Sequence, residues 1–514
     1  MKVQFSWKHW RGLRQLVQIV FFVAFILLLF AGLQRQTVFP LADFFFRINP
    51  LSALTAMLAA RAWIPRLGWA LVIIGLTVLI GRVWCGWICP FGTLLEWLPF
   101  RGARRRAKAI PPAWRTIKYV LLVVIIVGAL FGNLTLLVFE PLALFTRATT
   151  TVIIPALNYA INATESTLYN LAFLRPAISW LEELIRGPIL PVIQPVFDSS
   201  YLIAGLFLGI LALNLLADRF WCRYLCPLGG LLGWLSKFSL LSPLISKSCT
   251  GCTRCELLCK PGAIKTIPAT PESSREVEIM PSECTVCLDC LVSCNKASLG
   301  IGMVLKPAPA QNFDLSRRKF LESLAVGVAG VVLLRTDSRQ RTKNSRLIRP
   351  PGVKDDQAFL SQCLRCSECM KVCPTNGLQP AQDQAGLEGL WTPILVPRLG
   401  HCDFGCNACG QVCPSGAIPN LGLEQKRQAV IGTAIVNRNR CLPWASATPC
   451  IVCEEMCPTP QKSIRLEEVT LTDPAGETIT LQRPSVLREL CIGCGICENH
   501  CPLEGDAAIQ VYSL

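Results

Sequence analysis

The chain has 514 residues, a mean hydropathy of +0.44 and only 16% charged residues, which excludes a wholly soluble protein. Its formal charge of +16 lies mostly in segments that flank apolar runs, and no aromatic and basic nucleic-acid module is visible. We therefore expect a membrane protein that contacts lipid and binds no nucleic acid.

Four apolar runs in the N-terminal half are close to the length that spans a bilayer core of ~30 Å. They cover residues 16–33, 67–84, 117–138 and 201–217. Basic residues such as Lys2 and Arg14 precede the first run, and a basic segment, 101–118, lies between the second and third. Segment 139–200 is more acidic than basic. The positive-inside rule therefore predicts that the basic segments are cytoplasmic and that 139–200 lies outside.

Two segments of this half repeat one another, RVWCGWICPFGTLLEWL at 82–98 and RFWCRYLCPLGGLLGWL at 219–235. We expect a duplicated unit of helix, outer loop, helix and cysteine turn, so that both turns lie on the cytoplasmic face.

Each copy of the repeat carries a Cys-x3-Cys-Pro turn. The four cysteines are Cys85, Cys89, Cys222 and Cys226. Residues i and i+4 share one helix face, so each pair is predicted to present two thiols at the end of a span, where the proline ends the helix. The four thiols could hold a further cluster or metal ion, act as redox dithiols, line a quinone pocket, or simply be small apolar residues near a helix end.

The next segment predicts two iron-sulfur clusters. A C-x2-C-x2-C-x3-C run supplies three thiolates to one 4Fe-4S cubane from a tight loop, and its fourth usually serves a neighbouring cluster. Two runs occur here, Cys249, Cys252, Cys255, Cys259 and Cys284, Cys287, Cys290, Cys294. We predict that the first three cysteines of each run pair with the fourth of the other. Zinc knuckles normally lack this spacing, and disulfides across it would be strained.

Residues 316–334, SRRKFLESLAVGVAGVVLL, match the twin-arginine export pattern. No cleavage site of small residues follows, so this segment is predicted to remain as a fifth anchor. Arg335, Arg339, Arg341, Lys343, Arg346 and Arg349 would then lie outside, against the positive-inside tendency.

Four more groups of cysteines follow. They are Cys363, Cys366, Cys369, Cys373; Cys402, Cys406, Cys409, Cys413; Cys441, Cys450, Cys453, Cys457; and Cys491, Cys494, Cys497, Cys501. The second group begins with an x3 spacing and the third with an x8 spacing, so we expect their loops to differ from the others. The 24 cysteines of the six groups predict about six cubanes, with roughly four to six as the range.

Other redox cofactors are not expected. The three histidines lie outside the predicted spans and no C-x2-C-H run occurs, which excludes a bis-histidine haem in the bilayer and c-type haem. We see no Walker loop, no dinucleotide fingerprint and no flavin or nicotinamide site. Electrons must then enter from a diffusible carrier or a partner protein, and quinol is the economical choice for a membrane protein.

The first half, with duplicated W-C-x3-C-P turns before a two-cluster segment, resembles NapH/MauN-type membrane ferredoxins. The second half, with a twin-arginine segment, RPPG at 349–352 and CLRCSECMKVCPTNGLQP at 363–380, resembles MauM/NapG-type polyferredoxins. The resemblance implies a quinol-oxidising membrane part and an exported part that feeds a periplasmic reductase or maturation system.

The resemblance also implies nested ligand exchange among the last four groups. The outer groups would exchange with each other, Cys363, Cys366, Cys369 with Cys501 and Cys491, Cys494, Cys497 with Cys373. The two inner groups would do likewise. Exchange between sequential neighbours is the alternative.

The predicted fold is an α-helical membrane domain with small α+β bacterial-ferredoxin-like 4Fe-4S domains. The membrane domain, 1–240, has four spans as a duplicated two-helix unit. It is followed by a two-cluster cytoplasmic domain, 241–310, by an anchor and linker, 311–349, and by a four-cluster periplasmic domain, 350–514.

The predicted function is electron transfer in the bacterial cytoplasmic membrane, from the quinol pool to a periplasmic redox partner, with no catalytic residue nominated. One alternative is an accessory protein that supplies electrons or handles metal during assembly of another enzyme's metal centre. A redox sensor or regulatory scaffold is the other.

Overall fold

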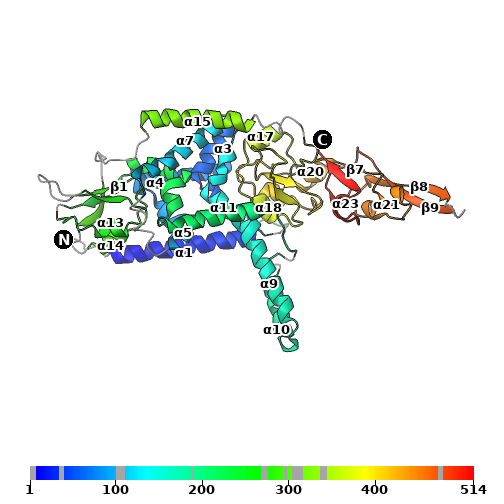
Figure 1. Ribbon diagram of the computed structural model, residues 1–514, viewed down its shortest axis with the longest axis horizontal. Coiled ribbons are helices and arrows are strands. Elements are labelled where there is room, and N and C mark those ends of the chain that lie inside the picture. Colours follow the sequence, from blue (N-terminus) through cyan, green and yellow to red (C-terminus); the bar gives the residue numbers. More distant parts are fainter. Residues whose placement is uncertain are drawn as a thin grey trace. The chain divides into compact units, whose positions relative to one another are not determined.

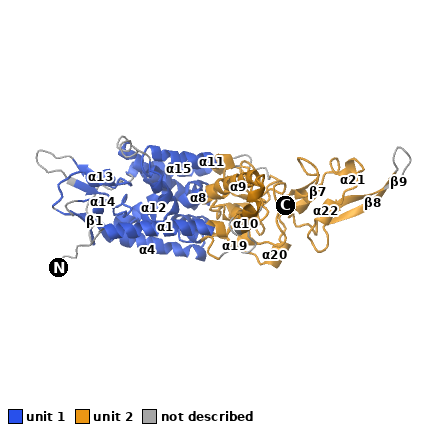
Figure 2. Ribbon diagram, turned by 90° about the horizontal axis from the view of Figure 1, so that it is seen from below, with its two compact units in different colours: residues 1–28, 44–145, 204–332 blue, residues 29–43, 146–203, 333–514 orange. Residues whose placement is uncertain are grey.

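The computed structural model divides the chain into two compact units (Figure 2). Unit 1 contains residues 1–28, 44–145 and 204–332, and unit 2 contains 29–43, 146–203 and 333–514. This division cuts across the predicted boundaries, because residues 241–303 form one unit with the helices that precede them. The residues that the structure describes are 7–33, 40–99, 110–186, 190–191, 193–198, 200–246, 248–267, 276–294, 298–303, 316–335, 344–472 and 478–513.

Unit 1 is built on apolar helices (Figure 1). They are α1 (Trp7–Ala31), α2 (Phe44–Arg47), α3 (Pro50–Ala60), α4 (Ala70–Ile80), α5 (Pro90–Trp97), α7 (Ile117–Leu130), α8 (Pro141–Ala148), α11 (Ser200–Ala212), α12 (Pro227–Leu235) and α15 (Arg317–Arg335). Short 3-10 turns extend several of them, at Pro65–Trp69, Pro112–Thr116, Thr135–Phe139, Leu213–Leu215 and Ser236–Phe238. Helices α1, α8, α11 and α15 each have a few residues that belong to unit 2.

Two of the described helices are long and apolar enough to cross a membrane, Lys8–Ala31 and Pro112–Leu130. The predicted spans 67–84 and 201–217 coincide with shorter apolar helices, Pro65–Ile80 and Ser200–Leu215. The first of these ends at Gly81, whose φ of 92° no continuing helix adopts. The four-span domain therefore stays a prediction. Lys2 and the basic residues at 101–108 lie outside the described residues.

Helix α15, the predicted fifth anchor, packs against the candidate span α7 (Figure 1). Its buried residues Ser323, Gly327 and Val331 recur every four positions and so form one face. A side chain at Gly327 would lie 3.0 Å from Val127 of α7, so glycine permits this close approach. Arg339, Arg341 and Lys343, which follow the helix, lie outside the described residues.

The two cysteine turns differ from the predicted helix ends. A π-helical turn covers Trp84–Ile88 in the first copy and Trp221–Leu225 in the second. Cys89 and Cys226 follow in extended backbone and are the N-caps of α5 and α12. The predicted stop at the proline is present, because each turn ends one residue before it; Pro90 and Pro227 also begin the next helix at N1, where no amide hydrogen is needed.

Residues 241–303 form a small α+β domain within unit 1. Strand β1 (Leu241–Ile245) pairs antiparallel with β4 (Leu299–Met303), and β2 (Ile264–Ile267) pairs with β3 (Glu276–Ile279). Helices α13 (Arg254–Leu258) and α14 (Asp289–Ser293) pack on each other. The predicted α+β architecture is present in this domain.

Buried ion pairs connect this domain to the helices of unit 1. The Lys118 ammonium on α7 donates to both carboxylate oxygens of Glu283, at 2.7 and 2.5 Å. Arg14 on α1 pairs with Glu96 on α5 at 3.1 Å, and Lys260 of the ferredoxin domain reaches the same carboxylate at 2.7 Å. Since burial of an unpaired charge costs several kcal/mol, these contacts specify how the domain docks.

Unit 2 contains the remaining elements. Its helices are α9 (Ile154–Leu168), α10 (Arg175–Ile185), α17 (Asp356–Leu360), α18 (Glu368–Val372), α19 (Ala408–Gln411), α20 (Leu423–Gln428), α21 (Leu442–Ala445), α22 (Val452–Glu455) and α23 (Ile496–Asn499), with a π-helical turn at Thr149–Ile153 and a 3-10 turn at Ala172–Leu174. Three antiparallel pairs of strands accompany them, β5 (Leu378–Pro380) with β6 (Pro393–Leu395), β7 (Thr433–Val436) with β10 (Ile509–Tyr512), and β8 (Ile464–Thr472) with β9 (Thr478–Val486).

The segment 146–203 packs against the C-terminal cysteine groups inside unit 2. Phe197 belongs to the same buried core as Phe359 and Cys363. The Asn376 amide donates to the Val196 carbonyl at 2.6 Å. The Arg147 guanidinium lies 4.2 Å from the centre of the Trp391 ring, a cation–π contact. Part of the predicted outer loop thus packs with residues 350–514, here called the second ferredoxin domain.

We predict that Glu283→Gln destabilises the protein by about 3–5 kcal/mol, because it leaves the buried Lys118 ammonium without a carboxylate. Thermal unfolding in detergent measures the change. Glu322→Gln is the control, because Glu322 pairs with Arg318 on the exposed surface of α15 and its loss should leave the unfolding temperature almost unchanged. Equal effects of the two substitutions would contradict a docking role for Glu283.

Candidate iron-sulfur sites

The loops that carry the cysteine runs have an unusual backbone. In four of the six groups, the residues two and four positions after the first cysteine have positive φ, as at Val286 (50°) and Leu288 (66°). The other such pairs are Gly251 and Thr253, Arg365 and Ser367, and Gly493 and Gly495. A β-branched residue such as Val286 rarely adopts this conformation, and such strain is typical of functional sites. Successive turns of this kind direct backbone amides inward, toward an anion.

The two groups with altered spacing lack this pair of left-handed residues. The x3 spacing after Cys402 and the x8 spacing after Cys441 give loops without it, and the x8 loop instead has one positive φ, 53° at Ala447. The structure thus agrees with the expectation that these two loops differ from the rest.

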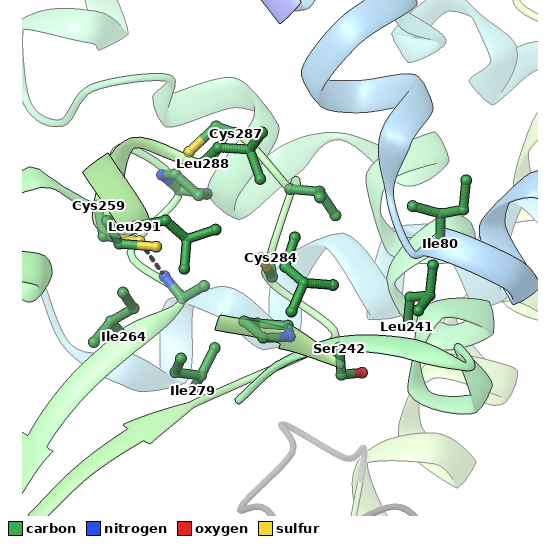
Figure 3. A pocket seen from close by; sticks show the side chains of 16 residues that line it. Ile80, Leu241, Ser242, Cys259, Ile264, Ile279, Cys284, Cys287, Leu288 and Leu291 are labelled. Carbon is green, nitrogen blue, oxygen red and sulfur yellow. Dashed lines mark hydrogen bonds between the residues drawn. The ribbon is translucent and has the colours of Figure 1, made fainter. Parts of the chain in front are cut away.

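One cavity brings together four cysteines of the first ferredoxin domain (Figure 3). Cys284, Cys287 and Cys290 line it together with Cys259, which comes from the other run. Leu288, Leu291, Ile264 and Ile279 cover it with apolar side chains. This is the grouping that the sequence predicts for one of the two clusters.

The second grouping of this domain is more open. Cys249, Cys252 and Cys255 lie close enough to interact electrostatically, and Cys252 is exposed. Cys294 packs against the small core that contains Cys255.

In unit 2, four groupings of cysteines form, each with three from one run and one from a neighbour. Three of them line cavities, Cys402, Cys406, Cys409 with Cys373; Cys441, Cys450, Cys453 with Cys501; and Cys491, Cys494, Cys497 with Cys457. The fourth lies in a buried core, Cys363, Cys366, Cys369 with Cys413.

The fourth cysteine therefore crosses to its sequential neighbour, and the expectation of nested exchange is wrong. The physical reason is the packing of the short helices, α18 on α19 and α22 on α23. Each helix ends close to the fourth cysteine of its own run, so that cysteine lies against the neighbouring loop. Cys373 directly follows α18, for example.

The four sites of unit 2 follow one another in space. Cys369 of the first lies in electrostatic range of Cys409 of the second. The Cys402 amide donates to the Cys494 carbonyl at 2.8 Å, which joins the second site to the site at 491–497. Cys497 in turn interacts with Cys453. Unit 2 thus holds a row of four adjoining sites.

Backbone hydrogen bonds at the cysteine sulfurs suit thiolate ligands, whereas burial without a bound cation favours the protonated thiol. Burial raises the pKa of Cys259 and Cys453 to about 12, so each stays protonated at neutral pH unless a cation displaces the proton. Backbone amides already donate to the sulfurs that cross over, such as Ala263 to Cys259 at 3.1 Å and Ala508 to Cys501 at 3.4 Å. Iron would supply the cation, and the donor set fits a 4Fe-4S cluster.

The described cysteines form neither disulfides nor a tight arrangement around one centre. All 28 cysteines are free, so none forms a disulfide. Among the described residues, no three His, Cys, Asp or Glu side chains converge tightly enough to hold a single metal ion. Zinc would need its sulfurs at ~2.3 Å from one centre.

The four cysteines of the repeat, Cys85, Cys89, Cys222 and Cys226, are here called the duplicated thiols. Each lies in electrostatic range of the other three. The structure therefore brings the two copies of the repeat together at their cysteine turns. Sequence reasoning assigned no role to Arg82 and Arg219, which flank these turns, although their recurrence in both copies was the available signal.

Comparison with known proteins adds family information. A family model described as a 4Fe-4S binding domain matches residues 62–108 and 200–248, and another with the same description matches 484–504. The methylamine utilization ferredoxin-type protein MauM of Methylorubrum extorquens is 36% identical over 209 residues, 38% of this chain and 88% of that protein.

Two ferredoxin-type proteins named NapG are also similar. That of Haemophilus influenzae is 33% identical over 213 residues, 40% of this chain and 74% of its own length. That of Escherichia coli is 36% identical over 206 residues, 38% of this chain and 86% of its own length. No solved structure matches the chain.

We predict that Cys373→Ser and Cys402→Ser each remove about four irons per chain, and that the double variant removes the same four, because both belong to one site. Cys373→Ser combined with Cys491→Ser should remove about eight. Iron and sulfide analysis of anaerobically purified protein measures this. Nested exchange would reverse the two results, with about eight irons lost in the first double variant and four in the second.

We predict that Lys426→Met lowers the reduction potential of one cluster. Burial raises the pKa of Cys402 to about 11, although the buried Lys426 ammonium, hydrogen-bonded to its sulfur, acts to lower it. The loss of a nearby charge worth roughly 1–4 kcal/mol corresponds to a fall of roughly 50–150 mV for one electron. Redox titration followed by electron paramagnetic resonance measures it.

The neighbouring substitution Arg427→Gln is the matched control for Lys426→Met. Arg427 carries the same charge but pairs with the exposed Glu424 at 2.7 Å. Its loss should leave all potentials almost unchanged, and a shift as large as that of Lys426→Met would show a general charge effect instead.

Proposed function

This chain belongs to the family of MauM and NapG ferredoxin-type proteins and is an iron-sulfur electron-transfer protein; we propose that it carries electrons from quinol to a periplasmic redox partner. It would be anchored in the bacterial cytoplasmic membrane and would combine a NapH/MauN-type first half with a MauM/NapG-type second half. Residues 241–303 would face the cytoplasm and residues 350–514 the periplasm.

The proposal rests on the contacts between the predicted loops and the two ferredoxin domains. Residues 241–303 contact segments predicted to be cytoplasmic, through Lys118 to Glu283 and Arg11 to Asp289. Residues 350–514 contact the predicted outer segment 139–200, through Val196 and Arg147. Each domain is thus associated with loops of one predicted side, which supports clusters on both sides of the membrane.

Ion pairs help to explain how the basic residues after α15 can lie outside the membrane, against the positive-inside tendency. Arg346 pairs with Glu498 at 3.1 Å, and Arg349 pairs with Asp356 at 2.6 Å, both within unit 2. Charges that are bound into a folded domain contribute little to the positive-inside rule, which applies to short loops.

Quinol oxidation releases two electrons and two protons and leaves quinone. Bound 4Fe-4S clusters accept and donate one electron at a time. The chain's own residues supply four thiolates to each site and place four sites of unit 2 side by side, which suits delivery to an oxidised metal centre of a partner protein. The released protons pass to solvent, since no residue is assigned as a general acid or base.

We expect a menaquinol analogue to reduce the iron-sulfur absorbance of purified protein in anaerobic detergent within seconds. A spectrum that stays oxidised, together with tight copper binding that Cys85→Ala and Cys222→Ala abolish, would overturn electron transfer from quinol and favour the accessory role in metal handling.

Protease treatment of oriented membrane vesicles is a separate experiment that tests the sidedness. Residues 350–514 should be digested only when the periplasmic face is exposed. Digestion only from the cytoplasmic face would refute the path across the membrane while leaving quinol oxidation possible.

A further inference from the structure

The duplicated thiols form a buried site where the two copies of the repeat meet. Cys85, Cys89 and Cys226 are each less than 10% exposed. The Arg219 guanidinium of the second copy donates to the Cys85 carbonyl of the first at 2.5 Å. The Gly92 amide donates to Cys89 Sγ at 3.4 Å, and its counterpart Gly229 donates to Cys226 Sγ at 3.2 Å. The two turns therefore have matching environments around one common space.

The two copies interlock through exchanged arginines. A side chain at Gly92 would meet the Arg219 guanidinium of the other copy at 2.7 Å. A side chain at Gly229 would meet the Arg82 guanidinium at 2.9 Å. Each glycine thus makes room for the arginine that crosses from the opposite copy. This reciprocity explains why both residues recur in the two segments of the repeat.

Buried cations share carboxylates around this site. Two buried carboxylates, Glu96 and Glu283, pair with four cations that are at most 2% exposed, Arg14, Arg82, Lys118 and Arg219. Because each carboxylate serves more than one buried cation, an additional anionic group at this place would be stabilised. A 4Fe-4S core with four thiolates carries a net charge of about −2 and would supply it.

Residues beside the cysteine turns carry buried hydrogen-bond donors without acceptors. The indole nitrogens of Trp84 and Trp221, which directly precede the first cysteine of each turn, are buried and have no partner among the described residues. The Nε atoms of Arg82 and Arg219 are also buried and have no hydrogen-bond partner among the described residues. Unmet buried donors are costly, and cluster sulfurs are acceptors that commonly receive such hydrogen bonds.

Neither copy holds enough cysteines alone. Each of the two matched stretches, 62–108 and 200–248, contains only one pair of the duplicated thiols, whereas a cubane needs four thiolates.

From this geometry we propose that the duplicated thiols together bind one further 4Fe-4S cluster, shared by the two copies of the repeat. The proposal does not depend on quinol being the electron donor.

The shared site adjoins the Cys284 site of the first ferredoxin domain. The Trp87 indole, inside the first turn, donates to the Val286 carbonyl at 3.0 Å, between Cys284 and Cys287. Arg82 donates to the Ser282 carbonyl at 2.8 Å and approaches Cys85 Sγ at 3.9 Å. Unit 1 would then hold three adjoining clusters, with the shared one nearest the helices.

Iron and sulfide analysis of anaerobically purified protein tests the proposal. The wild type should contain about 28 irons per chain rather than about 24. Cys85→Ser and Cys222→Ser should each remove about four, and the double variant should remove the same four, because the two residues serve one cluster. Cys252→Ser, in a separate site, is the comparison variant, and combined with Cys85→Ser it should remove about eight.

Several outcomes would overturn the shared cluster. Iron contents equal to wild type in both single variants would exclude a cluster at these cysteines. Additive losses in the double variant would indicate two separate sites. One zinc or copper per chain, lost in both variants, would indicate a single ion. If the variants fail to accumulate, a wild-type content of about 24 irons with all other sites full would itself refute the proposal.

Discussion

One constraint organises both ferredoxin domains: in five of the six runs, the fourth cysteine lies with the first three of a neighbouring run. The crossing ties together loops that are far apart in sequence, as with Cys373 and the loop at 402–409. Because no run completes its own set, the short helices must pack in pairs before any site forms. Strained loops with left-handed residues such as Arg365 are retained where this convergence holds them in place.

The same principle of completion by a partner appears in the helical part of unit 1. Each copy of the repeat contributes one pair of cysteines and one crossing arginine, and the glycines Gly92 and Gly229 provide the space. The carboxylates Glu96 and Glu283 then link this region to the ferredoxin domain, since each is shared by cations from several elements. Duplication thus produces an environment that neither copy has alone.

Features that depend on local spacing were predicted well from the sequence, and features that depend on the packing of distant segments were not. The x2-x2-x3 runs identified the loops and the exceptional spacings at Cys402 and Cys441, because three ligands come from one tight turn. The helix that begins at Pro90 was not predicted, since the sequence pattern does not show that a proline which follows one helix also begins the next. The choice between nested and sequential exchange needed the pairing of α18 with α19.

By itself the sequence determined the ligand type, the six groups of cysteines, the duplicated turns and the apolar character of the first half, because each depends only on composition or on the spacing of nearby residues. Only the tertiary structure decided which fourth cysteine completes which site, that segment 146–203 packs with the second ferredoxin domain, and that the duplicated thiols meet. Those features arise from contacts between residues that lie tens of positions apart, as with Cys373 and Cys402, or more than a hundred, as with Cys85 and Cys226, and no local pattern encodes such contacts.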